Sequence, residues 1–245
     1  MKTLFVNTRY LIVPVMSIIT ILGLISGGIN VWAGVALFGI SAIVDTATKN
    51  IHLRADFDEE GNSYGIKIFQ YAVMYLMLIV FVALQLALVW RIYQYVNGSP
   101  FDLYSFYGLT IQTGITTTNL IGAIISAGLW AGIGIIYGHE LSHNKKEGFF
   151  ISRLIMSLSG ASHFTYAHVY QHHLHLGHEN DPATAPRGRN VYMHTWLSHA
   201  GQCKFSYDLE TSRLKKKGKS FLSLDNRWIL GCLLYTSPSP RDKRQ

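Results

Sequence analysis

The chain has 245 residues, of which 49% are hydrophobic and only 14% are charged. An ordinary soluble domain carries about 25% charged residues, so this composition argues against a soluble protein and indicates membrane-spanning segments. The formal net charge of +7 does not indicate nucleic-acid binding, because the basic residues flank apolar stretches or lie in the polar C-terminal third. An anionic membrane surface attracts such residues, so we expect contact with membrane lipid and no nucleic-acid partner.

Four apolar stretches occur in the first part of the chain: Tyr10–Ile29, Val31–Val44, Ile68–Trp90 and Ile115–Gly138. A helix needs about 20 apolar residues to cross about 30 Å of hydrocarbon, and all but the second stretch meet that length. The second follows Gly27 and Gly28, which predicts the second arm of a tight helical hairpin. We therefore expect an all-α fold, a polytopic membrane helical bundle with about four transmembrane helices over residues 1–138.

Basic residues predict the orientation of these spans, because lysine and arginine gather on the cytoplasmic side of a membrane. Most of the 21 Lys and Arg residues follow residue 138, whereas the 91–114 loop carries only Arg91. The N-terminus, the 45–67 loop and the C-terminal third are therefore expected in the cytoplasm.

Residues 139–231 are expected to form a cytoplasmic-side, histidine-rich metal-binding region. Within it, Phe149–Gly160 is apolar but too short to span a membrane, and Arg153 interrupts it, which predicts a re-entrant or interfacial helix. Residues 232–245 differ abruptly in composition from what precedes them. They predict a non-native or disordered tail, with the natural sequence interrupted near residue 231.

All but one of the 11 histidines fall between residues 139 and 199. His139 and His143 have the i, i+4 spacing that places two rings on one face of a helix, and imidazole suits Zn, Cu, Fe and Ni. Together with Glu140 they also form HExxH, the signature of zinc metallopeptidases, in which Glu140 would be the general base.

A second group, His168, His172 and His173, has the spacing i, i+4 and i+5, which we interpret as three rings on one side of a helix. Five histidine ligands exceed the four that a tetrahedral zinc takes and fit two adjacent iron ions. The predicted metal ligands are His139, His143, His168, His172 and His173. We expect Glu140 and Asp181 to orient the ligand rings, and no catalytic residue beyond the metal ligands.

The other histidines are less informative. His175 and His178 remain open as ligands, although exposed polar positions are the favoured interpretation. The ones isolated in sequence are interpreted as non-ligands: His52, His163, His194 and His199. Cys203 and Cys232 lack the CxxC spacing of a zinc knuckle and do not indicate a disulfide framework.

The two histidine groups and the following Asp-Pro-Ala-Thr-Ala segment at 181–185 resemble the membrane alkane 1-monooxygenases. These belong to the di-iron superfamily of membrane fatty acid desaturases and hydroxylases. Residues 208–226 are also similar to that family, and the resemblance covers most of residues 1–231. The family's second histidine box usually reads Glu-His-Asn-Arg-Gly-His-His, and this chain departs from it at Ala167, Val169, Tyr170 and Gln171.

The resemblance implies a di-iron centre that uses O2 to hydroxylate the terminal carbon of alkanes or related acyl chains. It implies rubredoxin and its reductase as electron donors, and a bacterial inner membrane with the metal site on the cytoplasmic side. The family's third histidine box is missing, which supports the expected interruption near residue 231. The alternatives are a fatty acyl desaturase of the same superfamily, a membrane zinc metallopeptidase, and a metal-handling membrane protein without chemistry.

Overall fold

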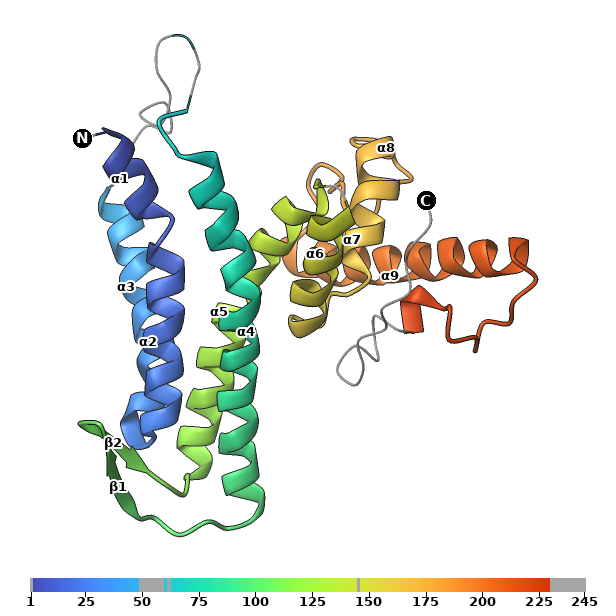
Figure 1. The fold of residues 1–245 in the computed structure, drawn as a ribbon. Helices are drawn as coiled ribbons and strands as arrows, with labels where there is room; N and C mark the ends of the chain where they lie inside the picture. The colour runs from blue at the N-terminus through green and yellow to red at the C-terminus, as the bar shows by residue number, and fades with distance from the viewer. Residues whose placement is uncertain (1, 49–59, 61–62, 145, 230–245) are drawn as a thin grey trace. The chain divides into compact units, whose positions relative to one another are not determined.

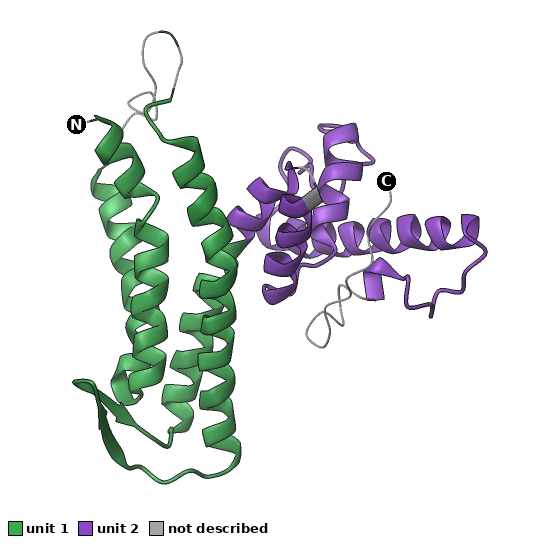
Figure 2. Ribbon diagram, in the orientation of Figure 1, with its two compact units in different colours: residues 1–134 green, residues 135–245 purple. Residues whose placement is uncertain are grey.

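The computed structural model describes residues 2–48, 60, 63–144 and 146–229 (Figure 1). His52, Cys232 and the tail predicted for residues 232–245 lie outside the described residues. The chain divides into two compact units, residues 1–134 and 135–245 (Figure 2).

The first unit is built from long apolar helices. Its elements are α1 (Lys2–Arg9), α2 (Ile12–Ser26), the 3-10 helix η1 (Gly28–Trp32), α3 (Ala33–Ala47), α4 (Lys67–Val96) and the first part of α5 (Thr117–Ser142). Within the described residues, 4 segments are long and apolar enough to cross a membrane: Lys2–Ser26, Gly28–Ala47, Lys67–Val96 and Thr117–Ser142. The prediction of an all-α membrane helical bundle is confirmed.

The predicted helical hairpin is formed by α2, η1 and α3, and α2 runs beside α3 (Figure 1). Gly27 and Gly28 reverse the chain with φ angles of 77° and 56°, which glycine adopts without steric cost. Close packing continues at Gly34 in α3, where an added Cβ would lie 2.7 Å from the Cβ of Ser126 in α5. The hydroxyl of Ser126 donates to the carbonyl oxygen of Val31 at 2.7 Å, so a buried hydrogen bond joins α5 to the hairpin.

Arg91 is fully buried inside α4, directly after the apolar stretch Ile68–Trp90 that predicted this span. Its Nε and Nη2 donate to the carbonyl oxygens of Leu24 and Ile25 at 2.5 and 2.7 Å. Its Nη1 donates to the side chain of Gln94 and to the carbonyl oxygen of Gln112. The last carbonyls of a helix have no intrahelical partner, so Arg91 satisfies the end of α2 while the helix that carries it continues.

A short antiparallel hairpin, β1 (Leu103–Phe106) and β2 (Leu109–Gln112), follows α4, and the sequence analysis did not predict it. Tyr107 and Gly108 form its turn with φ angles of 48° and 82°. Two successive residues with positive φ are typical of the type I′ turn that joins hairpin strands. Each strand has only four residues, which is too short for an alternating pattern to stand out.

The second unit contains the histidine-rich region. Its elements are α6 (Lys146–Leu158), α7 (Phe164–Ala167), the π-helical turn η3 (His168–His172), α8 (His173–His175) and α9 (Val191–Lys216). The short apolar stretch predicted to form a helix is α6. The long helix α9 begins after Asn190, whose side chain accepts hydrogen bonds from the backbone N–H groups of Tyr192 and Met193.

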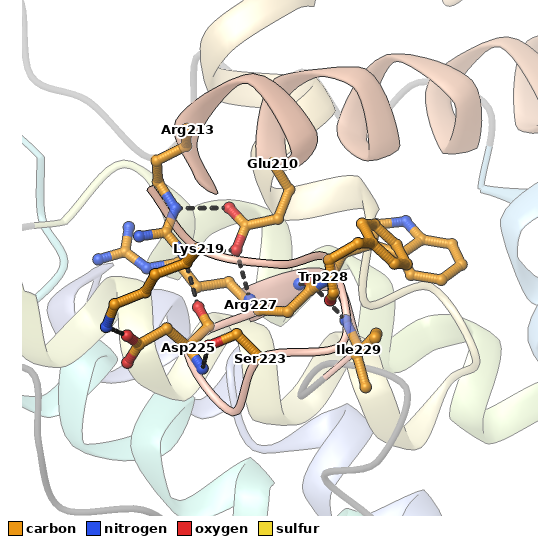
Figure 3. A network of polar contacts seen from close by, with 10 residues as sticks. Glu210, Arg213, Lys219, Ser223, Asp225, Arg227, Trp228 and Ile229 are labelled. Atoms are coloured by element: carbon orange, nitrogen blue, oxygen red, sulfur yellow. Dashed lines mark hydrogen bonds and ion pairs between the residues drawn. The ribbon is translucent and has the colours of Figure 1, made fainter. Parts of the chain in front are cut away.

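Residues 217–229 are fastened to α9 through the buried carboxylate of Glu210 (Figure 3). It accepts two hydrogen bonds from Arg213, at 2.6 and 2.7 Å, and one from the backbone N–H of Arg227 at 2.5 Å. Burial by itself would raise the pKa of Glu210, but these hydrogen bonds together hold the pKa below its usual value. Arg213 also donates to the carbonyl oxygen of Asp225, so one network fixes the segment.

Candidate metal centre

The first histidine group lies at the C-terminal end of α5. His139 and His143 are one helical turn apart, and their ring centroids are separated by 5.0 Å. The hydroxyl of Ser142 donates to the carbonyl oxygen of His139 at 2.6 Å and satisfies one carbonyl at the helix end. Both rings are therefore presented at the end of a helix that is apolar enough to cross a membrane.

The second histidine group lies on the π-helical turn η3, which the sequence analysis did not predict. The backbone N–H of His173 donates to the carbonyl oxygen of His168, the i to i+5 pattern of a π-helix. In a regular α-helix, positions i and i+5 point about 140° apart, so His173 would face away from His168. With roughly 4.4 residues per turn, the π-helix places positions i+4 and i+5 on either side of position i.

Nitrogen atoms from the two histidine groups converge. Nε2 of His168 lies 3.3 Å from Nε2 of His143 and 3.0 Å from Nε2 of His173. One ligand atom from each of His139, His143 and His168 also lies within 4.8 Å of the others. Nitrogens bound to one metal ion at about 2.0–2.1 Å are about 3 Å apart. The converging nitrogens are therefore already spaced as neighbouring ligands of one ion.

Two of the converging histidines are neutral at pH 7. Burial, followed by the neighbouring His139 and His173, lowers the pKa of His168 to about 3. Burial and the same two neighbours also lower the pKa of His143. A metal ion binds the neutral imidazole, so these two rings can accept one without first losing a proton.

The buried carboxylate of Asp181 orients His172 through a hydrogen bond. Its carboxylate accepts from Nδ1 of His172 at 2.7 Å, from the hydroxyl of Thr184 at 2.5 Å and from the N–H of Ala183 at 3.0 Å. Burial by itself would raise the pKa of Asp181, but these hydrogen bonds together hold the pKa below its usual value. The carboxylate keeps the ring proton of His172 on Nδ1 and leaves Nε2 for a metal ion.

Ser152 in α6 connects the two segments that carry the histidines. Its buried hydroxyl donates to the carbonyl oxygen of Gly138 at 2.5 Å and lies 3.3 Å from the hydroxyl of Thr165 in α7. Gly138 allows this approach, because an added Cβ would lie 2.8 Å from the Cε atom of the buried Met156. Gly138 directly precedes His139, so α6 sets the spacing between the two histidine groups. Sequence reasoning did not identify Ser152.

Glu140, His175 and His178 lie outside the converging nitrogens. The side chain of Glu140 is 57% exposed, and its Oε1 lies 3.2 Å from Nδ1 of His139, a position from which it can orient that ring. His175 and His178 are exposed, with ring centroids 6.3 Å apart. In the described part of the chain, neither belongs to a group of metal-ligand atoms.

A second group of metal-ligand atoms lies on α9 and on the residue that precedes α7. Ligand atoms of His163, His199 and Cys203 lie within 4.8 Å of one another. The two histidines are isolated in the sequence, which predicted non-ligands, but their ring centroids are 4.6 Å apart. The i, i+4 spacing of His199 and Cys203 is the signal that could have indicated this group.

Comparisons with known proteins bear on the first group. Residues 115–237, which include all five predicted ligands, match the family model described as fatty acid desaturase. The chain is 29% identical to alkane 1-monooxygenase 1 of Alcanivorax borkumensis over 86% of this chain and 49% of that protein. It is 36% identical to alkane 1-monooxygenase of Acinetobacter baylyi over 44% of this chain and 26% of that protein.

A further relative is the xylene/toluene monooxygenase hydroxylase component XylM of Pseudomonas putida, which is 26% identical over 89% of this chain and 54% of that protein. The chain thus spans about half the length of alkane 1-monooxygenase 1 and of XylM. The resemblance to alkane 1-monooxygenases that the histidine spacing predicted is confirmed.

Proposed function

We propose that this chain, which belongs to the fatty acid desaturase family, supplies histidine ligands to the di-iron centre of a membrane monooxygenase. The proposed reaction is hydroxylation of the terminal carbon of alkanes or related acyl chains, with O2 as oxidant and rubredoxin and its reductase as electron donors. The names of the relatives, alkane 1-monooxygenase and xylene/toluene monooxygenase, support a hydrocarbon substrate.

The observation that carries this proposal is the convergence of Nε2 atoms from His143, His168 and His173 at separations of 3.0 and 3.3 Å. His139 and His172 lie beside them, with ring centroids 4.3 and 5.5 Å from that of His168. Five imidazoles are more donors than one tetrahedral zinc takes, and imidazole is a suitable ligand for iron. The donor set therefore fits iron, with these five histidines as the proposed ligands.

Bound iron would supply the redox chemistry that couples reduction of O2 to oxidation of an unactivated C–H bond. The residues of the chain prepare the site. Asp181 holds the proton of His172 on Nδ1, and Glu140 is placed to do the same for His139. The hydroxyl of Ser152 joins the two histidine-bearing segments. Three of the five proposed ligand nitrogens therefore lie close together before any metal binds.

The place of the site suits a substrate that dissolves in lipid. His139 and His143 lie at the C-terminal end of a helix that can cross a membrane. The proposed metal ligands would therefore lie near the membrane surface. The ring of Phe164 stacks on that of His168 with centroids 5.1 Å apart and gives one side of the site an apolar wall. An alkane could reach such a site from the bilayer without passing through water.

The protein is an integral membrane protein, and we place the metal ligands on the cytoplasmic side of a bacterial inner membrane. The distribution of lysine and arginine supports this orientation. Arg91, the one arginine or lysine of residues 91–114, is not exposed, because it is buried against backbone carbonyls. No exposed arginine or lysine is then left in that loop to oppose the assigned orientation.

Product analysis tests the proposal. The iron-loaded protein is incubated in detergent with rubredoxin, its reductase, NADH and an n-alkane, and the products are separated by gas chromatography. A primary alcohol that disappears in His168→Ala and persists in the exposed control His175→Ala is the expected result. An alkene from an acyl substrate would instead indicate a desaturase. Peptide cleavage lost in Glu140→Gln would indicate a zinc metallopeptidase and contradict the oxygenase proposal.

A further inference from the structure

We propose that His163, His199 and Cys203 form a second metal site, which binds one zinc-like divalent cation. The cation would join the start of α7 to α9. The site shares no residue with the histidine groups described above, and it does not depend on the proposed oxygenase function.

The side-chain geometry suits a single small cation. His199 and Cys203 are one turn apart on α9 and share a face, and His163 approaches from the residue before α7. Because the three ligand atoms lie within 4.8 Å of one another, a point between them lies no more than ~2.8 Å from each. Small side-chain rotations bridge the remaining gap to the bond lengths of about 2.0–2.3 Å that zinc forms with nitrogen and sulfur.

The backbone around this group is already held in place. The buried hydroxyl of Ser206 donates to the carbonyl oxygen of His163 at 2.9 Å, which fixes the start of α7 on α9. Between the two ligands on α9, Gly201 lies against Pro182, since an added Cβ would be 2.5 Å from the Cβ of the proline. A site whose backbone is ordered beforehand loses little conformational entropy on binding.

The chemistry of the donors selects the kind of metal. Two imidazoles and one thiolate form a mixed nitrogen and sulfur set of the kind that zinc binds, and a fourth position is left for water. His163 is 7% exposed and His199 is exposed, so water can reach the site from the side of α9. Binding would deprotonate the Cys203 thiol.

The expected role of this site is structural. His163 precedes α7, and α7 continues directly into η3, which carries His168 and His172. A cation shared between His163 and α9 would therefore anchor the segment that presents the second histidine group. It would add to the hydrogen bond from Ser206 without taking part in the oxidation.

Cobalt(II) is the probe that separates this site from the histidine-only site. A cobalt–thiolate bond gives a charge-transfer absorption in the near ultraviolet, which nitrogen ligands alone do not give. The metal-stripped 245-residue chain is titrated with cobalt alone, and the same titration is made on Cys203→Ser, His199→Ala and Cys232→Ser. Size-exclusion elution verifies that each variant remains folded, and His194→Ala provides a control histidine on the same helix.

We expect the absorption to appear in the original chain, to be lost in Cys203→Ser and to persist in Cys232→Ser and His194→Ala. His199→Ala should bind cobalt more than about tenfold more weakly. The absorption should also persist in the double variant His139→Ala/His143→Ala, so that failure of this site and failure of the proposed oxygenase centre are distinguishable. Absence of the absorption from the original chain, its persistence in Cys203→Ser or its loss in Cys232→Ser would overturn the proposal.

Discussion

Nδ1 of His172 lies 2.7 Å from Oδ2 of Asp181, whose side chain is 1% exposed. This pair joins the second histidine group to the Asp-Pro segment that follows it in the sequence. Because the carboxylate accepts the Nδ1 proton, the other ring nitrogen is the one available for a metal ion. In the proposed site, Asp181 would therefore orient a ligand histidine without being a ligand itself.

Replacing Asp181 with Asn removes the charge that holds this proton in place. We expect Asp181→Asn to weaken iron binding by about 10–100-fold, because the amide can also present an N–H group and favour the wrong tautomer of His172. An iron titration of the metal-stripped protein measures the change. Glu179→Gln is the matched control, since Glu179 is exposed on the same loop and its replacement should leave the affinity unchanged. Equal affinities for all three proteins would show that Asp181 does not orient the ligand.

Ser152 holds the two histidine groups together through the carbonyl oxygen of Gly138 and the hydroxyl of Thr165. Ser152→Ala removes the buried hydrogen bond to the Gly138 carbonyl, which we expect to lower the free energy of unfolding by about 0.5–1.5 kcal/mol. Thermal unfolding in detergent measures this loss. The control is Ser157→Ala in the same helix, because the hydroxyl of Ser157 donates to the Arg153 carbonyl of its own helix. Ser152 has no connecting role if the two variants lose the same stability.

The guanidinium of Arg91 donates hydrogen bonds to carbonyl oxygens at the end of α2 and to Gln94 and Gln112. Lysine has a single ammonium group and cannot donate to all of these acceptors as the planar guanidinium does. We expect Arg91→Lys to lose about 1–3 kcal/mol and Arg91→Met more, since methionine leaves the carbonyls unsatisfied. Arg187→Met, at an exposed position, should change stability by less than about 0.5 kcal/mol. A stable Arg91→Met variant would contradict the assigned network.

The stability contributed by Glu210 should depend on pH in a defined direction. Its pKa in the folded protein lies below the usual value of 4.5. The stabilisation is therefore complete above pH 4.5 and is lost as the pH falls through the lower folded-state pKa. We expect Glu210→Gln to be less stable than the original chain at pH 7 by about 1–3 kcal/mol. Unfolding measured between pH 7 and pH 3.5 should show this difference shrinking, whereas a constant difference would contradict the ion-pair network.

The transmembrane helices and the first histidine group could be predicted from the sequence, because both depend on local patterns. Long apolar runs predict spans wherever the chain folds, and the i, i+4 spacing of His139 and His143 places them on one helix face. The span that contains Arg91 was predicted too short. Nothing in the local sequence indicates that the carbonyl oxygens of α2 accept hydrogen bonds from the Arg91 guanidinium.

The convergence of the second group was predicted for the wrong geometric reason. A regular α-helix would not bring His173 to the side of His168, and the π-helical turn that does so has no signal in the local sequence. Ser152 and the contact between His163 and His199 were also not predicted. They depend on how α6 and α9 pack, which joins residues distant in sequence.

The most direct test of the account is the metal content of the purified 245-residue chain, determined by elemental analysis after expression with iron and zinc both supplied. Cys203→Ser is included to remove zinc bound at the second site. We predict iron in the original chain and in Cys203→Ser, and its loss when His143 and His168 are both replaced with alanine. Iron that persists in the double variant would contradict the assignment of these histidines as ligands. Zinc in place of iron, lost in the double variant but not in Cys203→Ser, would contradict the di-iron centre.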